Sequence, residues 1–387
     1  MWRGSSLEHR VGVRLQDWRD AGLLRSLTPP TGIDLSSNDY LCLASDPRLA
    51  AALQVASARL GVGSTGSRLL RGQRDVFDAV ECQFAEFKQT ERALYFSSGY
   101  LANIAVLSAF IDAGDVVFSD ALNHASLIDG MRLSRARRVV FPHSDVESLA
   151  QAFDREPCSG IRFVVVESLF SMEGDIAPLQ AIASLCRANG AVLIVDEAHA
   201  VGVYGERGSG IIELAGIADA VCLSINTAGK ALGVAGAFVA GPAWAIEYLI
   251  QRGRPFVFST APPPALAEAL EQSLDIVHAE PERRARVLSR ALFLRQALRD
   301  RGVPVAGGAS QIVSIPIGDN ARAVAVADIL RAGGFDARAI RPPSVPEHTA
   351  RLRVSVNAGL TEHVLDRFSA ECAAALQRVG LCSTVSS

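Results

Sequence analysis

The chain has 387 residues, of which 49% are hydrophobic and 20% are charged, and its formal net charge is -3. This length predicts two domains, or one large domain with a smaller lobe, and the composition is typical of a globular protein with ample core. The near-neutral charge, with arginines interleaved among acids, argues against a nucleic-acid partner.

Membrane, secretion and metal signals are absent from the sequence. No uninterrupted apolar stretch reaches the roughly 20 residues of a membrane span, and the polar start, residues 1–10, lacks the apolar region of a signal peptide. The seven cysteines form no CxxC pair and have no zinc-type spacing; they are Cys42, Cys82, Cys158, Cys186, Cys222, Cys372 and Cys382. We therefore expect no metal, no membrane partner, and reduced thiols in the cytoplasm.

The N-terminal part, residues 1–45, reads as an arm. It contains an amphipathic stretch over 13–27, two prolines, a short strand-like segment at 33–35 and a polar turn at 36–40. We expect this arm to pack against the C-terminal domain. A helix is expected from Pro47 to Leu60.

The segment Gly61–Gly66 matches G-x-G-x-x-G. A dinucleotide-binding fingerprint requires a strand before the glycines and a helix that opens at them. Here a predicted helix precedes the glycines, and the acids that follow belong to an amphipathic helix over 75–87. The pattern therefore favours a glycine loop over a nucleotide site.

From residue 93 onward, short apolar runs alternate with helical segments. Continuous β-branched runs between helices indicate strands that are buried on both faces. We predict an α/β domain over 46–275, with a mostly parallel seven-stranded sheet covered by helices, whose ligands bind at the carboxyl ends of the strands. The predicted strands are 93–96, 115–118, 138–141, 161–166, 191–195, 220–224 and 236–240.

A proline-rich break at 254–264 and a long helical stretch over 265–301 precede a smaller α+β segment. Its predicted strands are 311–316, 335–340 and 351–355, and a helix ends it. We place a smaller C-terminal domain at 276–387.

Lysine is rare in this chain, and Lys88 and Lys230 are the only two. Lys88 stands in what reads as an ordinary polar helix end, whereas Lys230 lies between the apolar runs 220–224 and 235–240. A buried ammonium is costly, and burial lowers the pKa of an amine until it can act as nucleophile or base. The alternative is a strand-end lysine whose stem is buried and whose ammonium reaches water. This stretch alone leaves both readings open.

Other polar residues follow the predicted strands. Ser98, Gly99 and Tyr100 join a strand to a helix start, which suits a phosphate, although a serine-capped turn looks the same. Asp196 follows five apolar residues, so it either faces a cation or caps a helix. His199 would point the same way if a helical turn begins there.

A lysine, a buried acid and a phosphate anchor together suit pyridoxal 5'-phosphate (PLP). That cofactor needs a lysine for its Schiff base, an acid at its pyridine nitrogen and an anchor for its phosphate. His124, in the loop after the predicted strand 115–118, is a candidate for the face of the ring.

Five segments together resemble the α-oxoamine synthase family of fold-type-I PLP enzymes, which condense an amino acid with an acyl thioester and release CO₂. They are 97–100, 123–126, 167–175, 196–199 and 227–230. The segments 37–40, 233–239 and 341–346 resemble the family member that acts in biotin synthesis. That member joins L-alanine to a pimeloyl thioester, in which the pimeloyl group is carried by CoA or by an acyl carrier protein. The resemblance covers nearly the whole chain.

The resemblance implies a role for each matching residue. Lys230 would bind the cofactor covalently and move the α-proton, Asp196 would pair with the ring nitrogen, and His124 would stack on the ring and contact substrate. The remaining implied cofactor contacts are Ser171 and His199 near the phenolic oxygen, and Ser98, Gly99, Tyr100, Thr227 and a homodimer partner's Thr260 or Ser259 at the phosphate. The implied substrate contacts are Arg353 and Asn38 at the amino-acid carboxylate, and Arg25 and Ser344 at the acyl group.

The chain departs from the family pattern at two positions. Phe77 stands where the family usually has a histidine, and Ser344 replaces a more usual threonine. Sibling enzymes that use glycine or serine (2-amino-3-ketobutyrate ligase, 5-aminolevulinate synthase, serine palmitoyltransferase) stay as alternatives, disfavoured by 341–346. A non-catalytic PLP-binding regulator is a further alternative, disfavoured because the chain shows no basic patch.

Overall fold

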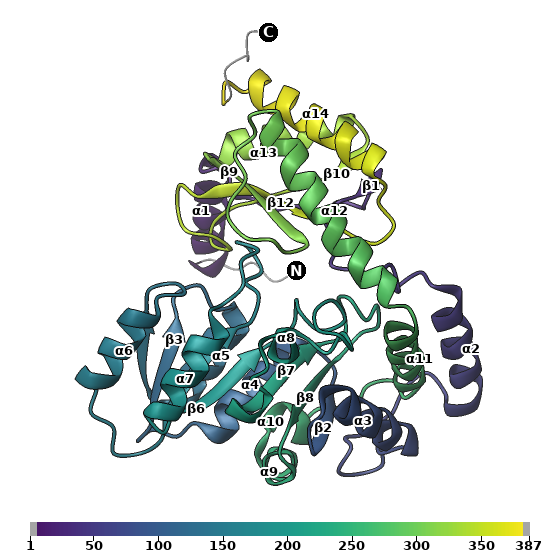
Figure 1. Ribbon diagram of the computed structural model, residues 1–387, viewed down its shortest axis with the longest axis vertical. Coiled ribbons are helices and arrows are strands. Elements are labelled where there is room, and N and C mark those ends of the chain that lie inside the picture. Colours follow the sequence, from purple (N-terminus) through teal and green to yellow (C-terminus); the bar gives the residue numbers. More distant parts are fainter. Residues whose placement is uncertain (1–5, 382–387) are drawn as a thin grey trace.

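A seven-stranded sheet forms the centre of the larger part of the molecule in the computed structural model, which describes residues 6–381 (Figure 1). All its strands run parallel except β8, which is antiparallel to both neighbours. In sheet order the strands are β2 Arg92–Phe96, β8 Ala237–Gly241, β7 Val221–Thr227, β6 Val192–Asp196, β5 Arg162–Glu167, β3 Val116–Asp120 and β4 Arg137–Phe141. The predicted seven strands and their mostly parallel arrangement are confirmed.

Both faces of this sheet are buried because successive side chains of a strand point in opposite directions. Val116 and Phe118 of β3 pack into one hydrophobic core, whereas Val117 between them packs into the other. Helices cover both faces, as expected for a parallel sheet.

Two sets of helices supply the covering layers. The core on one face includes side chains from α2 Pro47–Leu60, α3 Asp75–Lys88, α6 Val146–Arg155, α7 Leu179–Ala188, α8 Ile211–Ala215 and α11 Ala265–Ala279. The core on the other face includes side chains from α4 Gly99–Phe110, α5 Ala125–Ser134, α9 Ala243–Arg252 and α10 Arg254–Val257. A short 3-10 helix, η1 Ala218–Ala220, precedes β7.

A second, smaller sheet lies above the first in Figure 1 and has its own hydrophobic core. It is antiparallel, in the order β11 Arg338–Ile340, β12 Ala350–Ser355, β9 Ile312–Gly318. The helices that accompany it are α12 Pro281–Asp300, α13 Asn320–Ala332 and α14 Glu362–Arg378. From the N-terminal arm, β1 Ile33–Asp34 pairs in parallel with β10 Phe335–Asp336, and Leu35 enters the same core.

The structure differs from the predicted elements in two places. The predicted strand 335–340 is divided into β10 and β11, which pair with different strands. The predicted helical stretch 265–301 is two helices, because Pro281 lacks the N–H that a continuous helix would need there. Helix α11 runs across position 275, and the domain limits at 45 and 275 stay predictions.

The arm begins with α1 Ser6–Asp20, which buries none of its side chains. Residues 1–5 of the predicted arm, and Cys382, lie outside the described residues. Within residues 6–381, no helix combines the length and apolar character that a membrane crossing requires.

The glycine segment Gly61–Gly66 is a loop between α2 and α3, with a helix before it, as expected. It packs on the segment that follows α10: the Ser64 hydroxyl donates to the Pro262 carbonyl at 2.6 Å, and the Ala261 N–H donates to the Gly66 carbonyl at 2.9 Å. The loop therefore has a packing role rather than the strand–helix context of a nucleotide fingerprint.

Candidate active site

Polar side chains from four strand ends meet in a cavity of about 170 Å³. The strands β2, β5, β6 and β7 end at the same edge of the sheet, since β8 alone among these neighbours is reversed. The cavity is lined by Gly99, Tyr100, Asn103, His124, Ser126, Glu167, Asp196, Ala198, His199, Thr227 and Lys230. Seven of the sequence-predicted site residues are thus brought together, and Ser98 adjoins them.

The first turn of α4 forms one wall. The Ser98 hydroxyl caps the helix by accepting from the Leu101 N–H at 3.3 Å. Gly99 starts the helix, and a Cβ built on it would lie 2.2 Å from the Thr227 hydroxyl oxygen. Only glycine fits there, so the free N–H groups of a helix start and the Thr227 hydroxyl share one small space, as an anion site needs.

Asp196 closes β6 and is held in one orientation. Its Oδ1 accepts from the Ala198 N–H at 2.8 Å, and its Oδ2 accepts from Asn103 Nδ2 at 2.8 Å. Asn103 also donates to the Ser126 hydroxyl at 2.9 Å. The sequence analysis missed Asn103, although it lies four residues after Gly99 and therefore on the same face of α4.

His124 caps α5 and faces the cavity. Its Nδ1 lies 2.7 Å from the Ser126 hydroxyl, and its backbone N–H donates to Glu167 Oε1 at 2.6 Å. Burial lowers the pKa of His124, and burial together with nearby Asp196 raises the pKa of Glu167 well above its usual value. Glu167 was not singled out from the sequence, although it ends β5 as Asp196 ends β6 and is paired with it in register.

Lys230 follows β7 and turns its amine toward His199. Its Nζ lies 2.9 Å from His199 Nε2. Burial lowers the pKa of Lys230 to about 8, against the opposing effect of Asp196 and Glu167. Burial, followed by the charge of Lys230, holds the pKa of His199 well below its usual value. The site therefore combines a neutral imidazole with an amine that is partly unprotonated near neutral pH.

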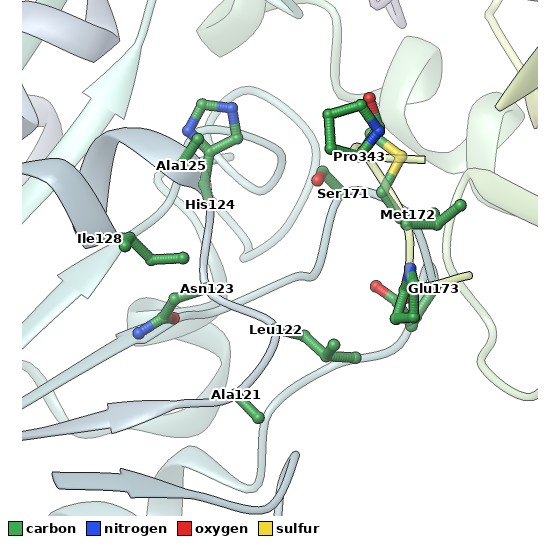
Figure 2. Close-up of a pocket in the computed structure, with 13 residues that line it drawn as sticks. Ala121, Leu122, Asn123, His124, Ala125, Ile128, Ser171, Met172, Glu173 and Pro343 are labelled. Atoms are coloured by element: carbon green, nitrogen blue, oxygen red, sulfur yellow. The ribbon is translucent and has the colours of Figure 1, made fainter. Parts of the chain in front are cut away.

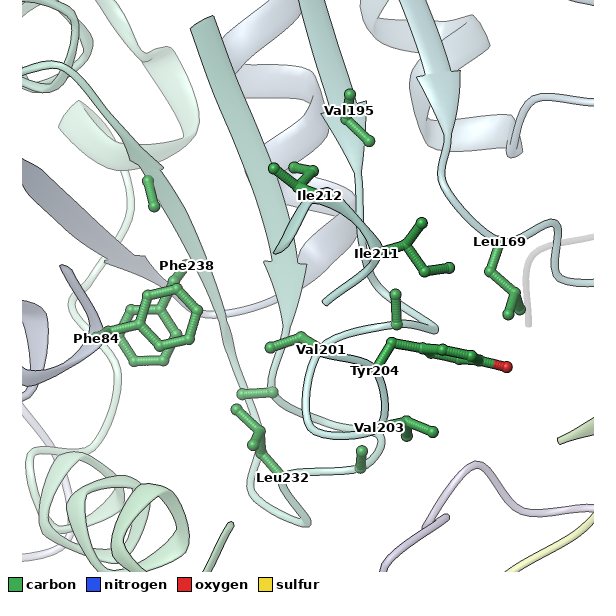
Figure 3. Packing of buried hydrophobic residues seen from close by; sticks show 14 of the residues in the cluster. Phe84, Leu169, Val195, Val201, Val203, Tyr204, Ile211, Ile212, Leu232 and Phe238 are labelled. Atoms are coloured by element: carbon green, nitrogen blue, oxygen red, sulfur yellow. The ribbon is translucent and has the colours of Figure 1, made fainter. Parts of the chain in front are cut away.

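The turn that carries His199 is fixed by core packing and by a buried ion pair. Val201, Val203 and Tyr204 lie in the core beside Leu232, as Figure 3 shows. The ion pair joins Lys88 Nζ to Glu197 Oε2 at 2.6 Å, and Lys88 also donates to the Ser209 carbonyl at 2.5 Å. Both charged side chains are buried.

The sequence interpretation of Lys88 as an ordinary polar helix end is therefore wrong. The residues around Lys88 in the sequence are polar, but its side chain reaches inward from the last turn of α3 to Glu197, 109 positions away. Nothing in the local sequence indicates this long-range partner.

Arg353, on β12 of the smaller sheet, reaches the same region. It donates to the Ser171 carbonyl, to the Ser355 hydroxyl at 2.9 Å and to Asn38 Oδ1 at 3.0 Å. The residue is buried, yet no carboxylate among the described residues forms an ion pair with it. Its neighbour Arg351 pairs instead with Glu173 at 2.9 Å. A buried guanidinium without an acid is suited to an external anion.

A second cavity of about 400 Å³ adjoins the first at His124 (Figure 2). In Figure 2, His124 lies on one side of this pocket, and Ser171, Met172 and Pro343 lie on the other. Its lining mixes apolar and polar residues and comprises Ala121, Leu122, Asn123, His124, Ala125, Ile128, Ser171, Met172, Glu173, Pro343, Ser344, Val345 and Pro346. Arg25 reaches its edge, where Nη2 donates to the Ser344 hydroxyl at 3.2 Å.

Two sequence-predicted features lie apart from these cavities. Thr260 is exposed and lines a separate pocket near Arg68, so its own protomer does not bring it to Lys230. Phe77 is buried, and the Arg68 guanidinium lies over its ring at 4.8 Å from the centroid. The phenyl ring at this position therefore packs against a cation.

The donor set fits PLP. The cavity offers a lysine amine, a fixed carboxylate one strand away, an imidazole, and a helix start in which a Cβ has no room. The amide oxygen of Asn103, in the cavity wall, has no hydrogen-bond partner in the described part of the chain. These are the groups that a Schiff base, a pyridine nitrogen and a phosphate require.

The chain is similar to known proteins over most of its length. The chain is 48% identical to the 8-amino-7-oxononanoate synthase of Anaeromyxobacter dehalogenans strain 2CP-C over 380 residues, which cover 95% of each chain. Among solved structures, it resembles a serine palmitoyltransferase from S. paucimobilis with bound PLP, with a TM-score of 0.90, 30% identity, and coverage of 97% and 99% of the two chains. It also resembles the 8-amino-7-oxononanoate synthase of Francisella tularensis, with a TM-score of 0.79, 29% identity, and coverage of 90% and 98%.

The family model described as aminotransferase class I and II matches residues 30–371. This match spans both sheets and every residue of the cavity around Lys230. The chain therefore belongs to the class I and II aminotransferase family and, within it, to the 8-amino-7-oxononanoate synthases.

Proposed function

We propose that this enzyme condenses L-alanine with a pimeloyl thioester to form 8-amino-7-oxononanoate, with release of CO₂ and free thiol, in biotin synthesis. The observation that carries the proposal is the placement of Arg353, a buried cation that has no acid partner in residues 6–381. It lies beside the Lys230–His199 pair and next to a pocket with a partly apolar wall. Relatives from Anaeromyxobacter dehalogenans and Geobacter sulfurreducens, 45% and 42% identical over at least 95% of this chain, are named 8-amino-7-oxononanoate synthase.

Nine residues are proposed to contact the cofactor. Lys230 would bind PLP covalently, Asp196 would face its ring nitrogen, and His124 would cover its ring. The phosphate would bind at the start of α4, with Ser98, Gly99, Tyr100 and Thr227, and the phenolic oxygen would lie near Ser171 and His199. When bound, PLP supplies an electron sink for carbanion chemistry at the α-carbon of the amino acid.

Lys230 is the proposed base. A pKa of about 8 leaves a useful share of neutral amine near neutral pH, so Lys230 can accept a proton from the substrate's α-carbon and return it later. Burial, followed by the charges of Lys230 and Arg353, lowers the pKa of His199 and keeps it neutral, so His199 orients the amine and does not compete with it for the proton.

Arg353 and Asn38 are the proposed carboxylate site for alanine. The guanidinium presents donors in a fork that matches a carboxylate, and Asn38 already contacts it. The acyl donor would occupy the 400 Å³ pocket, whose apolar wall suits a methylene chain, with His124, Arg25 and Ser344 as its polar contacts.

The active form is proposed to be a homodimer in the cytoplasm. Thr260, or Ser259 beside it, would contact the phosphate of the other subunit, since neither residue lines the cavity of its own protomer. Phe258 is 72% exposed in the same segment, which suits a surface that another chain covers. Five cysteines of the described part, Cys42, Cys82, Cys158, Cys186 and Cys222, are free thiols, in keeping with a reducing compartment.

A substrate panel tests the function directly. The purified, PLP-loaded enzyme is incubated with alanine, glycine or serine, each with pimeloyl-CoA, a pimeloyl acyl carrier protein, acetyl-CoA, succinyl-CoA or palmitoyl-CoA, and the products are identified by mass. Alanine with a pimeloyl thioester should give the mass of 8-amino-7-oxononanoate, and Lys230→Ala should give none. A product from serine and palmitoyl-CoA alone would instead assign the enzyme to the serine palmitoyltransferase type.

A further inference from the structure

Tyr40 joins the two halves of the candidate site. Its side chain has 0% exposure. The phenol oxygen lies 2.7 Å from His199 Nδ1, 3.1 Å from Asn38 Oδ1 and 3.4 Å from Arg353 Nη2. His199 in turn lies 2.9 Å from Lys230. Polar atoms therefore form an unbroken path from the buried guanidinium to the amine.

The single phenol proton gives this path two arrangements. A neutral imidazole also carries one N–H, so each of its nitrogens is either donor or acceptor. If Tyr40 donates to Asn38, His199 carries its proton on Nδ1, and its Nε2 accepts from Lys230. If Tyr40 donates to Nδ1, the His199 proton is on Nε2 and points at Lys230.

The second arrangement constrains the amine. An ammonium has three donors and no lone pair, so Lys230 can accept from Nε2–H only as the neutral amine. With a neutral Lys230, both arrangements contain the same number of protons. They differ only in which imidazole nitrogen is protonated and in where the phenol O–H points. The protonated form of Lys230 is compatible with the first arrangement alone.

Asn38 selects between the arrangements. Its Oδ1 accepts from both Arg353 Nη2 and Tyr40. A carboxylate bound to Arg353 would repel that oxygen, so the amide turns and presents its Nδ2–H to the carboxylate. An N–H cannot accept from Tyr40, and His199 Nδ1, at 2.7 Å from the phenol oxygen, is then the nearest acceptor.

We propose that Tyr40 is a positioning residue that transmits carboxylate binding at Arg353 to the His199–Lys230 pair by setting the tautomer of His199. The amine is then held neutral, as a base must be, when the amino acid is in place. This inference rests on the proposed role of Arg353. If Tyr40 only fills space beside the His199 ring, whose centroid lies 6.1 Å from its own, no such link exists.

The test reads the tautomer of His199 in the full-length enzyme before PLP is added, when Lys230 carries a free amine. Two-bond ¹H–¹⁵N spectra of ¹⁵N-histidine-labelled protein distinguish Nδ1–H from Nε2–H, and His199→Asn identifies the signal. Propionate is the probe, because it has the carbon skeleton of alanine without the amine. In the wild type, saturating propionate should move the proton from Nδ1 to Nε2. Tyr40→Phe should abolish this response.

Tyr95→Phe is the matched control. Tyr95 is also buried, but its hydroxyl donates to the Ala235 carbonyl at 2.7 Å and not to His199. The Tyr95 variant should respond to propionate as the wild type does. A Tyr40→Phe protein that responds in the same way overturns the proposal.

Asn38→Leu provides a second experiment that needs no ligand. It does not depend on Arg353 or on the folding of the Tyr40 variant. Without its amide acceptor, Tyr40 should donate to His199 and give Nε2–H before propionate is added. Persistence of Nδ1–H in this variant overturns the proposal. The line width of ¹³C-propionate reports binding separately: binding without a tautomer change overturns the coupling alone. Absence of binding overturns the carboxylate role of Arg353 and, with it, the coupling.

Discussion

At the scale of single residues, the two lysines are distinguished by their partners rather than by burial. Lys88 is held in an ion pair with Glu197, whereas Lys230 faces the cavity beside a neutral imidazole. A paired ammonium has no lone pair with which to attack an aldehyde, and the partly neutral amine of Lys230 has one. Local polarity in the sequence separated the two lysines, but it did not indicate that Lys88 is also buried.

Borohydride reduction of the PLP-loaded enzyme should therefore attach the cofactor to the peptide that contains Lys230. Peptide mass spectrometry locates the label, and Lys230→Arg should remove it while Lys88 is unchanged. Label on the Lys88 peptide would show that the Lys88–Glu197 pair opens to the cofactor, and the assignment of Lys230 would be wrong.

The two arginines of β12 offer a matched pair for the carboxylate site. Arg353 has no carboxylate partner among the described residues, whereas Arg351 is paired with Glu173. We expect Arg353→Lys to raise the L-alanine concentration for half-maximal change in cofactor absorbance by about tenfold, since one charge-assisted hydrogen bond contributes about 1.5 kcal/mol or more. Arg351→Lys should shift it far less. Equal titration curves for the two variants would remove Arg353 from the carboxylate site.

At the scale of elements, the sequence predicts what depends on local patterns. Apolar β-branched runs gave the seven strands, and Pro47 marked the first residue of α2. The division of 335–340 into β10 and β11 could not be predicted, because it depends on β1, a segment 302 positions earlier, as the partner of Phe335. Pairing partners far apart in the chain leave no local signal.

The loop between β5 and α7, residues 168–178, links the two sheets at the site. Its Ser171 and Glu173 contact the arginines of β12, and its Gly174 carbonyl accepts from the Ser310 hydroxyl at 2.6 Å. On the side of the larger sheet, His143 holds the loop: Nε2 lies 2.9 Å from Asp175, and Nδ1 lies 2.9 Å from Asp120 at the end of β3.

The charge of His143 should make this attachment dependent on pH. Burial alone would lower the pKa of His143, but its bonds to Asp120 and Asp175 raise it to about 10. Because folding raises this pKa, the protonated ring stabilises the folded state. The stabilisation is complete below the unfolded pKa of about 6.5, and it is lost as the pH rises to about 10. The Tm advantage of the wild type over His143→Gln should therefore shrink between pH 6.5 and 10.

Thermal unfolding at pH 6.5, 8 and 10 measures this change. His278→Gln is the control, because His278 is exposed on α11, and its small Tm effect should not follow the same trend. A His143→Gln difference that stays constant over the range would mean that the ring acts through shape and neutral hydrogen bonds rather than through its charge.

At the scale of the whole molecule, the site is built where the two sheets and the arm meet. Lys230 and Asp196 come from the larger sheet, Arg353 from the smaller one, and Asn38 and Tyr40 from the arm. Arg25 and Ser344 make contact although 319 positions separate them. Motif resemblance could assign these residues to one site, but single-sequence patterns could not bring them together, because the distances depend on how separate cores pack.

The exposed segment around Thr260 gives the last prediction. It is anchored to the glycine loop 61–66, and beside that loop Leu70 is 82% exposed. Apolar side chains gathered near a hydroxyl that is unused in its own protomer indicate a surface that a second copy covers. We expect light scattering to give about twice the chain mass of 41.0 kDa.

If Thr260 reaches the phosphate of the partner's cofactor, Thr260→Val should weaken PLP binding several-fold, because a valine keeps the shape and loses one hydrogen bond to a charged group, worth about 1.5 kcal/mol or more. Ser259→Ala removes the neighbouring hydroxyl and should leave PLP affinity near that of the wild type. Equilibrium dialysis of PLP against both dimeric variants makes the comparison. A larger loss of PLP affinity in Ser259→Ala than in Thr260→Val would assign the phosphate contact to Ser259. Unchanged affinity in both dimers would mean that the phosphate is held within one subunit, by the start of α4 and Thr227 alone.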